Sequence, residues 1–346
     1  MWTTGPSCDL LNMAPATVPN GLDFVQGFHT WGGHALKDPE TGKWTGLFSL
    51  LEGHCGLNTW TTNSAIVIAS ADTVTGPYSL PGPPTEAPAL ITPPWAHNAM
   101  LTRNPSVPVG SPDAYLMFHI GSGSVPRDKW QNCTTEGGEE EAHPSKVVGQ
   151  GEPSNSAYVA TAPRLSGPWT NIPTPILVNL TGSWASTATN PAPVIFENGT
   201  TLLFFAGSTC PEGWGNLAPN CVGVAMAPSW KGPYTTMPLP VSHPESEDPF
   251  VFKVGDSFHL VTNVNTYHKR CAAGVACGGH AWSEDGITWS NLTVGAFGPA
   301  VTLENGTRIV HQYVERPQVV LGDDGKPLAL FLGMDYSSSR SWSQKF

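Results

Sequence analysis

Apolar residues in this chain fall into short runs separated by turn sequences. One pattern, NPAPVIFENGTTLLFFAG from Asn190, has a proline, a β-rich run, a turn and a second apolar run. It recurs from Asn104, Asp248 and Arg316, and a more diverged copy runs from Gly33. Each copy predicts a β-hairpin, because proline is tolerated at the first residue of a strand, where no ladder donor is lost.

A second pattern follows the hairpins and ends in Gly-Pro-aromatic. It occupies residues 63–78, 155–169 and 221–234, with a divergent copy at 279–289. Each copy predicts a third strand, a turn and the start of a fourth strand. Five hairpins with these outer strands predict an all-β, five-bladed β-propeller with four-stranded antiparallel blades. The alternative is a two-sheet sandwich in which the repeats are coincidental.

The repeats extend over nearly the whole chain, and no linker divides it. We therefore expect one domain over residues 1–346, in which residues 1–28 form a closing segment and join the C-terminal strand to complete the ring. Composition agrees with this fold. Only 12% of residues are charged, whereas Gly (37) and Pro (34) are abundant, which suits strands and turns better than long surface helices.

In a propeller the innermost strand of each blade lines the central channel, and its first residues face one mouth. We predict that Pro105, Pro191, Pro249 and Pro317 each lie at the start of an innermost strand. The residues just before them should then converge at the mouth. These are Gly32 and Gly33, Arg103 and Asn104, Thr189 and Asn190, Glu247 and Asp248, and Glu315 and Arg316.

Charge and hydropathy exclude several classes of function. The formal net charge is -11, with 27 acidic and 16 basic residues, so the nucleic-acid class is not expected. No apolar run approaches the length of a transmembrane helix, so a membrane partner is not expected. The first twenty residues show no signal-peptide pattern. Oligomeric state stays open.

The cysteines indicate an oxidising compartment. Cys210 with Cys221 and Cys271 with Cys277 are close in sequence and predict two disulfides that pin loops at the mouth. At least one of Cys8, Cys55 and Cys133 is then free or pairs elsewhere. Sequons for N-glycosylation lie at Asn132, Asn179, Asn198, Asn291 and Asn305. We expect a secreted, extracellular glycoprotein.

Four short motifs carry a family resemblance. They are HTWGG from His29, EDPF from Glu247, GHAWSEDG from Gly279 and ERP from Glu315. With the Gly-Pro-aromatic repeats, the chain resembles five-bladed glycoside hydrolases over roughly residues 27–346. It is most similar to glycoside hydrolase family 43, in its galactan-cleaving branch.

That resemblance implies a set of catalytic carboxylates. Family 43 enzymes use a base Asp in the first blade, a pKa-tuning Asp and an acid Glu. The glutamate two residues before proline matches Glu247 and also Glu315. Blade one departs from the family, with glycine and His34 where the base Asp would lie. Asn104 and Asn190 stand where aspartates would be expected.

Hydrolysis of a glycosidic bond needs one proton donor and one group that activates water or attacks carbon. We predict that Glu247 and Glu315, with Asp248 beside them, supply these groups in one funnel. Like charges held close raise one pKa and so create a protonated acid beside an ionised partner. A histidine could take the missing role. The candidate binding residues are Trp31, His34, His54, Trp60, His97, Arg103, Asn104, Asn190, His280 and Arg316.

Each candidate also has a structural interpretation. Glu247 could bind sugar hydroxyls, Asp248 could cap backbone groups, and Glu315 could be held in an ion pair with Arg316 or Arg103. The histidines, asparagines and tryptophans could serve packing and capping alone.

Metal motifs such as HExxH, paired CxxC or an EF-hand loop are absent from the sequence, so no cofactor or metal site is predicted. A calcium ion could plug the channel, as in related propellers, but the sequence assigns it no ligands. The first hypothesis is a glycoside hydrolase acting on a polysaccharide or oligosaccharide. The alternatives are a non-catalytic carbohydrate-binding propeller and an extracellular structural or adhesive protein.

Overall fold

The computed structural model describes most of the chain. The described residues are 1–5, 8–22, 28–51, 53, 55–81, 90–92, 95–121, 133, 156–176, 178–185, 187–207, 209–211, 220–242, 246–264, 277–311, 313–335 and 340–346.

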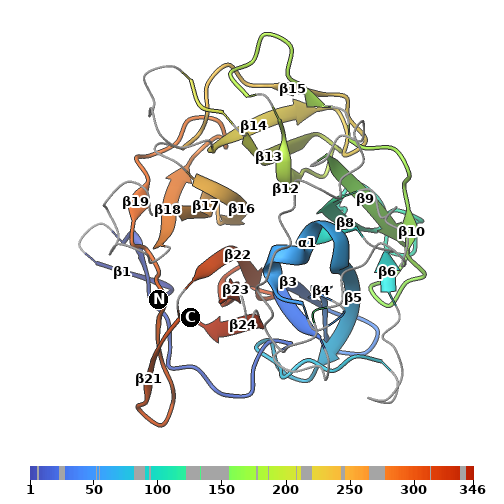
Figure 1. Ribbon diagram of the computed structural model, residues 1–346. Helices are drawn as coiled ribbons and strands as arrows, with labels where there is room; N and C mark the ends of the chain where they lie inside the picture. Colours follow the sequence, from blue (N-terminus) through green and yellow to red (C-terminus); the bar gives the residue numbers. More distant parts are fainter. Residues whose placement is uncertain are drawn as a thin grey trace.

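Five antiparallel sheets stand around a common centre, which confirms the predicted five-bladed propeller (Figure 1). Blade 1 contains β3 (His29–Lys37), β4 (Trp44–Leu51), β5 (Ser64–Ala71) and β6 (Leu90–Thr92). Blade 2 contains β7 (His97–Arg103), β8 (Tyr115–Ile120), β9 (Ala157–Ala162) and β10 (Thr170–Asn171). Blade 3 contains β12 (Thr189–Ile195), β13 (Thr201–Gly207), β14 (Cys221–Ala227) and β15 (Tyr234–Thr236).

The last two blades follow the same order from the centre outward. Blade 4 contains β16 (Ser246–Val254), β17 (Ser257–Val264), β18 (Cys277–Ser283) and β19 (Thr293–Val294). Blade 5 contains β22 (Val314–Leu321), β23 (Pro327–Met334) and β24 (Arg340–Lys345). Outside this pattern lie β1 (Thr3–Thr4), β2 (Leu10–Leu11), β11 (Val178–Asn179), β20 (Ala300–Thr302), β21 (Arg308–Val310), η1 (Leu57–Thr59) and α1 (Trp60–Asn63).

The N-terminal segment closes the ring against blade 5. The amide of Ala14 donates to the carbonyl of Lys345 in β24 (2.9 Å), and the side chain of Gln344 donates to the carbonyl of Ala14. The Ser343 hydroxyl accepts from the amide of Gly21 at 3.0 Å. The two termini accordingly lie near one another (Figure 1).

The Gly-Pro-aromatic pattern shapes the turn after the third strand. In blades 1 and 3 the hydroxyls of Tyr78 and Tyr234 each donate to the carbonyl four residues earlier, both at 2.9 Å. In blade 2 the indole of Trp169 does the same to Leu165 (3.2 Å). The glycine before the proline has φ of +84° at Gly76, which an L side chain rarely adopts.

Fully buried aromatic side chains form the cores of the blades. Phe48, Phe118, Phe204 and Phe331 lie on the second strands of four blades and are at most 1% exposed. Each such ring removes enough apolar surface from water to contribute roughly 2–3 kcal/mol. The described helices, η1 and α1, include none long and apolar enough to cross a membrane.

Each innermost strand carries the same irregularity near its start. The pairing register shifts after Trp31, His97, Thr189, Glu247 and Glu315. The next residue in every blade has a left-handed backbone, with φ of +56°, +57°, +51°, +53° and +55° at Gly32, Asn98, Asn190, Asp248 and Arg316. These β-bulges re-aim the side chains at one end of the ring, which we call the mouth.

The repeated bulge shows that the innermost strand of blade 2 starts earlier in the sequence than predicted. Pro191, Pro249 and Pro317 lie near the start of their innermost strands, as predicted, and each directly follows the left-handed residue of its blade. Pro105 lies beyond the other end of β7, and Ala99 occupies the proline position of this blade. The prediction was wrong here because the turn between β7 and β8 is much longer than its counterparts, so a fixed spacing back from Gly121 ends inside the turn.

Candidate functional site

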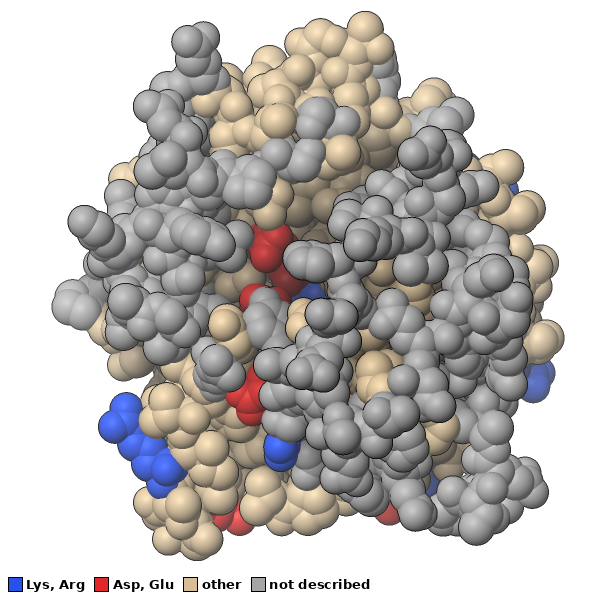
Figure 2. Space-filling model, in the orientation of Figure 1, with Lys and Arg blue, Asp and Glu red and all other residues tan. Residues whose placement is uncertain are grey.

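The five residues that precede the bulges line one cavity at the mouth. We call them the slot residues: Trp31, His97, Thr189, Glu247 and Glu315. The cavity measures about 380 Å³, a size that small ligands fill. Equivalent positions in five blades therefore converge on one space, with aromatic, hydroxyl and carboxyl groups. Acidic side chains are visible in the hollow at the centre of this face (Figure 2).

Glu247 is a buried carboxyl group held by amides. The Nδ2 atom of Asn220 donates to its Oε2 at 2.6 Å, and Nδ2 of Asn263 lies 3.5 Å from its Oε1. Burial, followed by the negative charges of Asp248 and Glu315, raises the pKa of Glu247 to about 8. A carboxyl group with that pKa is protonated at neutral pH.

Glu315 faces the same cavity from the neighbouring blade. Its negative charge is one of the causes that raise the pKa of Glu247. The structure thus brings together the two glutamates that the sequence selected.

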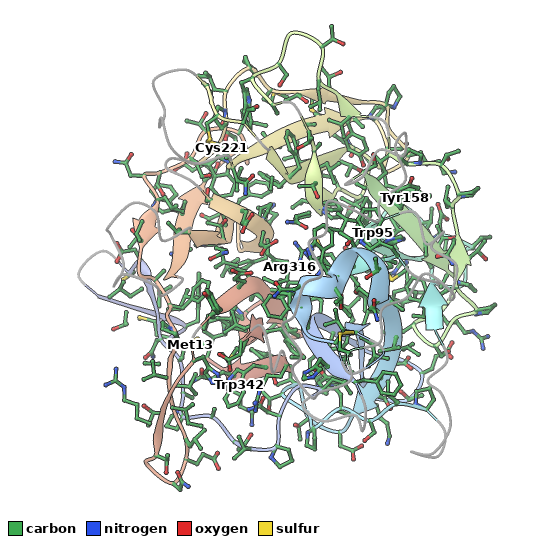
Figure 3. All side chains as sticks on the ribbon, viewed as in Figure 1. Met13, Trp95, Tyr158, Cys221, Arg316 and Trp342 are labelled. Carbon is green, nitrogen blue, oxygen red and sulfur yellow. A yellow bond between two sulfur atoms is a disulfide. The ribbon has the colours of Figure 1, made fainter. Side chains whose placement is uncertain are left out.

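Asp248 is paired with Arg316 under the cavity. The Nη1 atom of Arg316 lies 3.1 Å from Oδ1 of Asp248, and both side chains are buried. The Nη2 atom donates to the carbonyl of Asn98 at 2.8 Å. A Cβ atom at Gly32 would lie 3.1 Å from the Arg316 side chain. Arg316 therefore touches blades 1, 2 and 4 and fills the centre of the ring (Figure 3).

Two asparagines form the wall opposite the glutamates. The Nδ2 atom of Asn98 donates to Oδ1 of Asn190 at 3.0 Å, and both residues line the cavity. The Oδ1 atom of Asn98 is buried and has no hydrogen-bond partner. This amide pair joins blades 2 and 3 at their bulges.

Aromatic side chains complete the wall on blades 1 and 2. The Trp60 ring lies 5.5 Å from the His97 ring, and both line the cavity with Trp31. Nδ1 of His97 is 2.7 Å from the hydroxyl of Ser64. Burial, and then the charge of Arg316, lower the pKa of His97 to about 3, so this imidazole is neutral at neutral pH.

Several predicted site residues lie away from the cavity. Arg103 and Asn104 are at the far end of β7, where Arg103 donates to the carbonyls of Ala114 and Val107, and Asn104 caps its own turn through Ser106. Their placement at the mouth was wrong for the same reason as that of Pro105.

Two of the predicted histidines are structural in their contacts. His34 is buried one residue past the bulge, between the carbonyls of Leu101 (2.7 Å) and Val319 (3.2 Å), and burial lowers its pKa to about 4. It does not line the described cavity. His280 lies in β18, 3.1 Å from His259. His54 lies outside the described residues.

Sequence reasoning missed other residues of the cavity. The most informative are Asn98, which takes the place predicted for Asn104, and Asn220, the partner of Glu247. The repeated left-handed position is the signal for Asn98, because asparagine and glycine tolerate it best. The remaining missed lining residues are Leu57, Asn58, Ile120 and Thr187.

Disulfides hold two segments at the mouth. Cys210–Cys221 forms as predicted, with Cα atoms 5.5 Å apart, and Cys221 adjoins Asn220. Cys55 pairs with Cys133 across 78 residues, a bond that sequence spacing does not indicate. Cys8 is free and exposed. The predicted Cys271–Cys277 bond involves Cys271, which lies outside the described residues.

In the described part of the chain, no three His, Cys, Asp or Glu side chains are placed to hold a metal ion. The cation at the centre of the ring is the guanidinium of Arg316, which is shared between Asp248 and the carbonyl of Asn98.

Three solved structures that superpose on this chain are glycoside hydrolases. A thermostable family 43 glycoside hydrolase superposes with a TM-score of 0.55 at 12% identity, covering 95% of this chain and 90% of its own. A family 117 glycoside hydrolase from the marine bacterium Zobellia galactanivorans gives 0.53 at 13% identity, with coverage of 96% and 88%. The catalytic domain of a Coprinopsis cinerea α-L-arabinofuranosidase gives 0.57 at 11% identity, with coverage of 96% and 94%.

These likenesses define the class of fold, a five-bladed propeller of the kind that carries glycoside hydrolases. No protein-family model matches the sequence, and no curated protein matches it.

Proposed function

We propose that this protein is a glycoside hydrolase whose catalytic pair is Glu247 and Glu315. The observation that carries the proposal is the buried carboxyl of Glu247, with its pKa raised to about 8, beside a second carboxylate in one cavity. A protonated acid next to an ionised partner is the arrangement that glycosidic cleavage requires. Glycoside hydrolase chemistry on the same fold supports the assignment.

Glu247 acts as the general acid. Both oxygens of Glu247 face an amide donor, Oε2 at 2.6 Å from Nδ2 of Asn220 and Oε1 at 3.5 Å from Nδ2 of Asn263, so the more weakly held Oε1 is the better site for the acidic proton. That proton passes to the glycosidic oxygen as its bond to the anomeric carbon breaks, and the leaving sugar departs as an alcohol.

Glu315 acts on the anomeric carbon side. Its carboxylate either takes a proton from the attacking water or bonds to the carbon before water replaces it. Both routes need a negative group facing the developing positive charge. Asp248 remains paired with Arg316 and adds to the negative field that keeps Glu247 protonated. Trp60 offers a ring face for packing against the sugar.

We also propose that the enzyme is secreted and acts on carbohydrate outside the cell. The disulfides Cys55–Cys133 and Cys210–Cys221 support this, since such bonds persist in oxidising compartments.

The function is tested with a broad panel of polysaccharides and aryl glycosides. The wild type should cleave at least one of them, and Glu247→Gln should lower kcat at least roughly 100-fold, the usual scale for loss of a general acid. Glu304→Gln, an exposed glutamate between β20 and β21, is the matched control and should keep full activity. Full activity of Glu247→Gln would assign the acid to another group.

A second candidate is a propeller that binds carbohydrate without cleaving it. Gly32 favours it, because the position after the slot in blade 1 carries no carboxylate. Sugar binding by a wild type that cleaves nothing in the panel would support this candidate.

A further inference from the structure

We propose that Asn98 and Asn190 form a specificity-determining subsite that binds two adjacent hydroxyl groups of an uncharged sugar ring. The inference rests on the proposed function for the nature of the ligand, but not on catalysis. Neither Asn98 nor its pairing with Asn190 was expected from the sequence. Four observations carry the proposal: the amide pair, its fixed orientation, an unpartnered buried acceptor, and the charge of the cavity.

The amide pair leaves one donor and one acceptor outside its own hydrogen bond. Nδ2 of Asn98 is engaged by Oδ1 of Asn190, which leaves Oδ1 of Asn98 and Nδ2 of Asn190 for a ligand. Turning both amides over exchanges the two atoms but still leaves one donor and one acceptor. Neighbouring hydroxyls on a sugar ring match this arrangement, because one can donate while the other accepts.

The backbone holds the pair in position. The amide of Asn98 donates to the hydroxyl of Ser49 (3.0 Å), and its carbonyl accepts from Arg316 (2.8 Å). Asn98 and Asn190 sit at equivalent bulges, with φ of +57° and +51°. The two amides are therefore preorganised, and little side-chain freedom is lost when a ligand binds.

Oδ1 of Asn98 is the acceptor that a ligand hydroxyl would satisfy. It is buried in a residue that lines the cavity, and it has no hydrogen-bond partner. A buried acceptor without a donor destabilises the unliganded protein, and a ligand hydroxyl would remove that cost. A site of this kind discriminates strongly against an analogue that lacks the hydroxyl.

The charge of the cavity selects an uncharged sugar. Its described lining contains Glu247, Asp248 and Glu315 and includes neither lysine nor arginine. The nearby guanidinium of Arg316 is already engaged by Asp248 and by the carbonyl of Asn98. Because Glu247 is protonated at neutral pH and Asp248 is paired with Arg316, a carboxylate or sulfate on the sugar would meet the negative charge of Glu315 without a free cation to offset it.

The competing explanation is conformational, since asparagine tolerates a left-handed backbone better than most residues. Blade 1 separates the two explanations, because glycine occupies the equivalent position at Gly32. Substitution of either asparagine by glycine keeps the backbone accessible and removes only the amide.

The test measures binding of free monosaccharides, which the enzyme cannot cleave. Calorimetry on the full chain would use D-glucose, D-galactose, D-mannose, D-xylose, L-arabinose and L-fucose, with D-glucuronate and D-galacturonate as charged counterparts. We expect at least one neutral sugar to bind, and each uronate to bind at least tenfold more weakly than its neutral counterpart. Asn98→Gly and Asn190→Gly should each weaken the neutral sugar at least tenfold.

A deoxy analogue of the bound sugar distinguishes direct recognition of a hydroxyl by Asn98 from a structural role of this residue. Loss of the recognised hydroxyl should weaken binding to the wild type but have little further effect on Asn98→Gly. Asn171→Ala, on the exposed edge strand β10, is the control and should bind like the wild type. If Asn98→Gly does not fold, Asn190→Asp, of the same shape but without the donor offered to the ligand, replaces it and should also weaken binding.

Three outcomes would overturn the proposal: glycine variants that bind like the wild type, a uronate that binds better than its neutral counterpart, or no binding of any neutral sugar. These outcomes are distinct from failure of the proposed function. An enzyme that cleaves glycosides through Glu247 could still ignore Asn98, and a propeller without activity could still bind sugar through it.

Discussion

Polar groups find hydrogen-bond partners at one end of the ring, whereas several buried polar atoms at the other end have none. At the far end, the turns between the first and second strands of the blades satisfy their polar groups locally. Oδ1 of Asp38 accepts from the amide of Glu40 (2.9 Å), Oδ1 of Asn198 accepts from the amide of Thr200 (3.0 Å), and Oδ1 of Asp324 accepts from the amide of Lys326 (3.1 Å). The ion pairs there are exposed, as between Lys37 and Asp323.

At the mouth, several buried polar atoms are left without a partner. They include Oδ1 of Asn98 and Oδ1 of Asn263, the second on a residue that contacts Glu247. Folded proteins rarely leave such atoms unpaired. We infer that the mouth keeps part of its hydrogen-bonding capacity for a ligand, whereas the described turns at the far end satisfy their polar groups locally.

The largest effect is expected at the buried ion pair. Arg316→Met should lower the free energy of unfolding by about 3–5 kcal/mol, because Asp248 would remain buried without its cation. Denaturant unfolding measures the loss. The double variant Arg316→Met/Asp248→Asn should recover part of it, since no buried charge is then left alone. A loss below about 1 kcal/mol for the single variant would show that the centre of the ring tolerates an unpaired carboxylate.

Catalysis should depend on the carboxyl groups among the slot residues and not on every slot side chain. Glu315→Gln should lower kcat at least roughly 100-fold, because the amide cannot act as a carboxylate base or nucleophile. Thr189→Ala removes the slot side chain of blade 3 and should change kcat less than tenfold. Steady-state kinetics on the substrate found in the panel measures both. Equal losses would mean that the substitutions act through the shared shape of the cavity.

The same contrast explains what the sequence could predict. The hairpins of blades 3, 4 and 5 were predicted correctly because their turns, such as ENGT and GDDG, are short local signals. Glu247 and Glu315 each lie two residues before the proline of such a blade, and this shared position predicted that they face one cavity. Their catalytic roles stay proposals.

The errors came where local signals end. In blade 2 the turn over residues 104–114 is long, so the count from Gly121 selected Asn104 in place of Asn98. The bond between Cys55 and Cys133 joins residues 78 apart, and only the assembled ring brings them together. The raised pKa of Glu247 depends on burial and on Asp248 and Glu315 as placed by two blades.

The pH dependence should follow Glu247. If it is the acid, kcat/KM falls as pH rises through about 8, roughly tenfold per unit above it. Stability should move in the same direction. The folded protein keeps the proton up to about pH 8, whereas an unfolded glutamate loses it near 4.5, so stability declines as pH rises through this window.

Glu247→Gln separates this effect from other titrations. The variant has no proton to lose at this position, so its thermal unfolding temperature should rise relative to the wild type between pH 5 and pH 8. A constant difference between the two proteins across that range would mean that Glu247 titrates alike in the folded and unfolded states.

The smallest effect is expected at the far end. Lys37 and Asp323 form an ion pair between blades 1 and 5 at 3.3 Å, but their side chains are 47% and 85% exposed. Water and salt screen such a pair, so Lys37→Ala should change the free energy of unfolding by at most about 0.5 kcal/mol and leave activity unchanged. Denaturant unfolding of Lys37→Ala and Arg316→Met at low and high salt compares the two losses of unfolding free energy directly. Because both pairs join neighbouring blades, a comparable loss for Lys37→Ala would mean that cross-blade pairing, and not burial at the mouth, sets the cost.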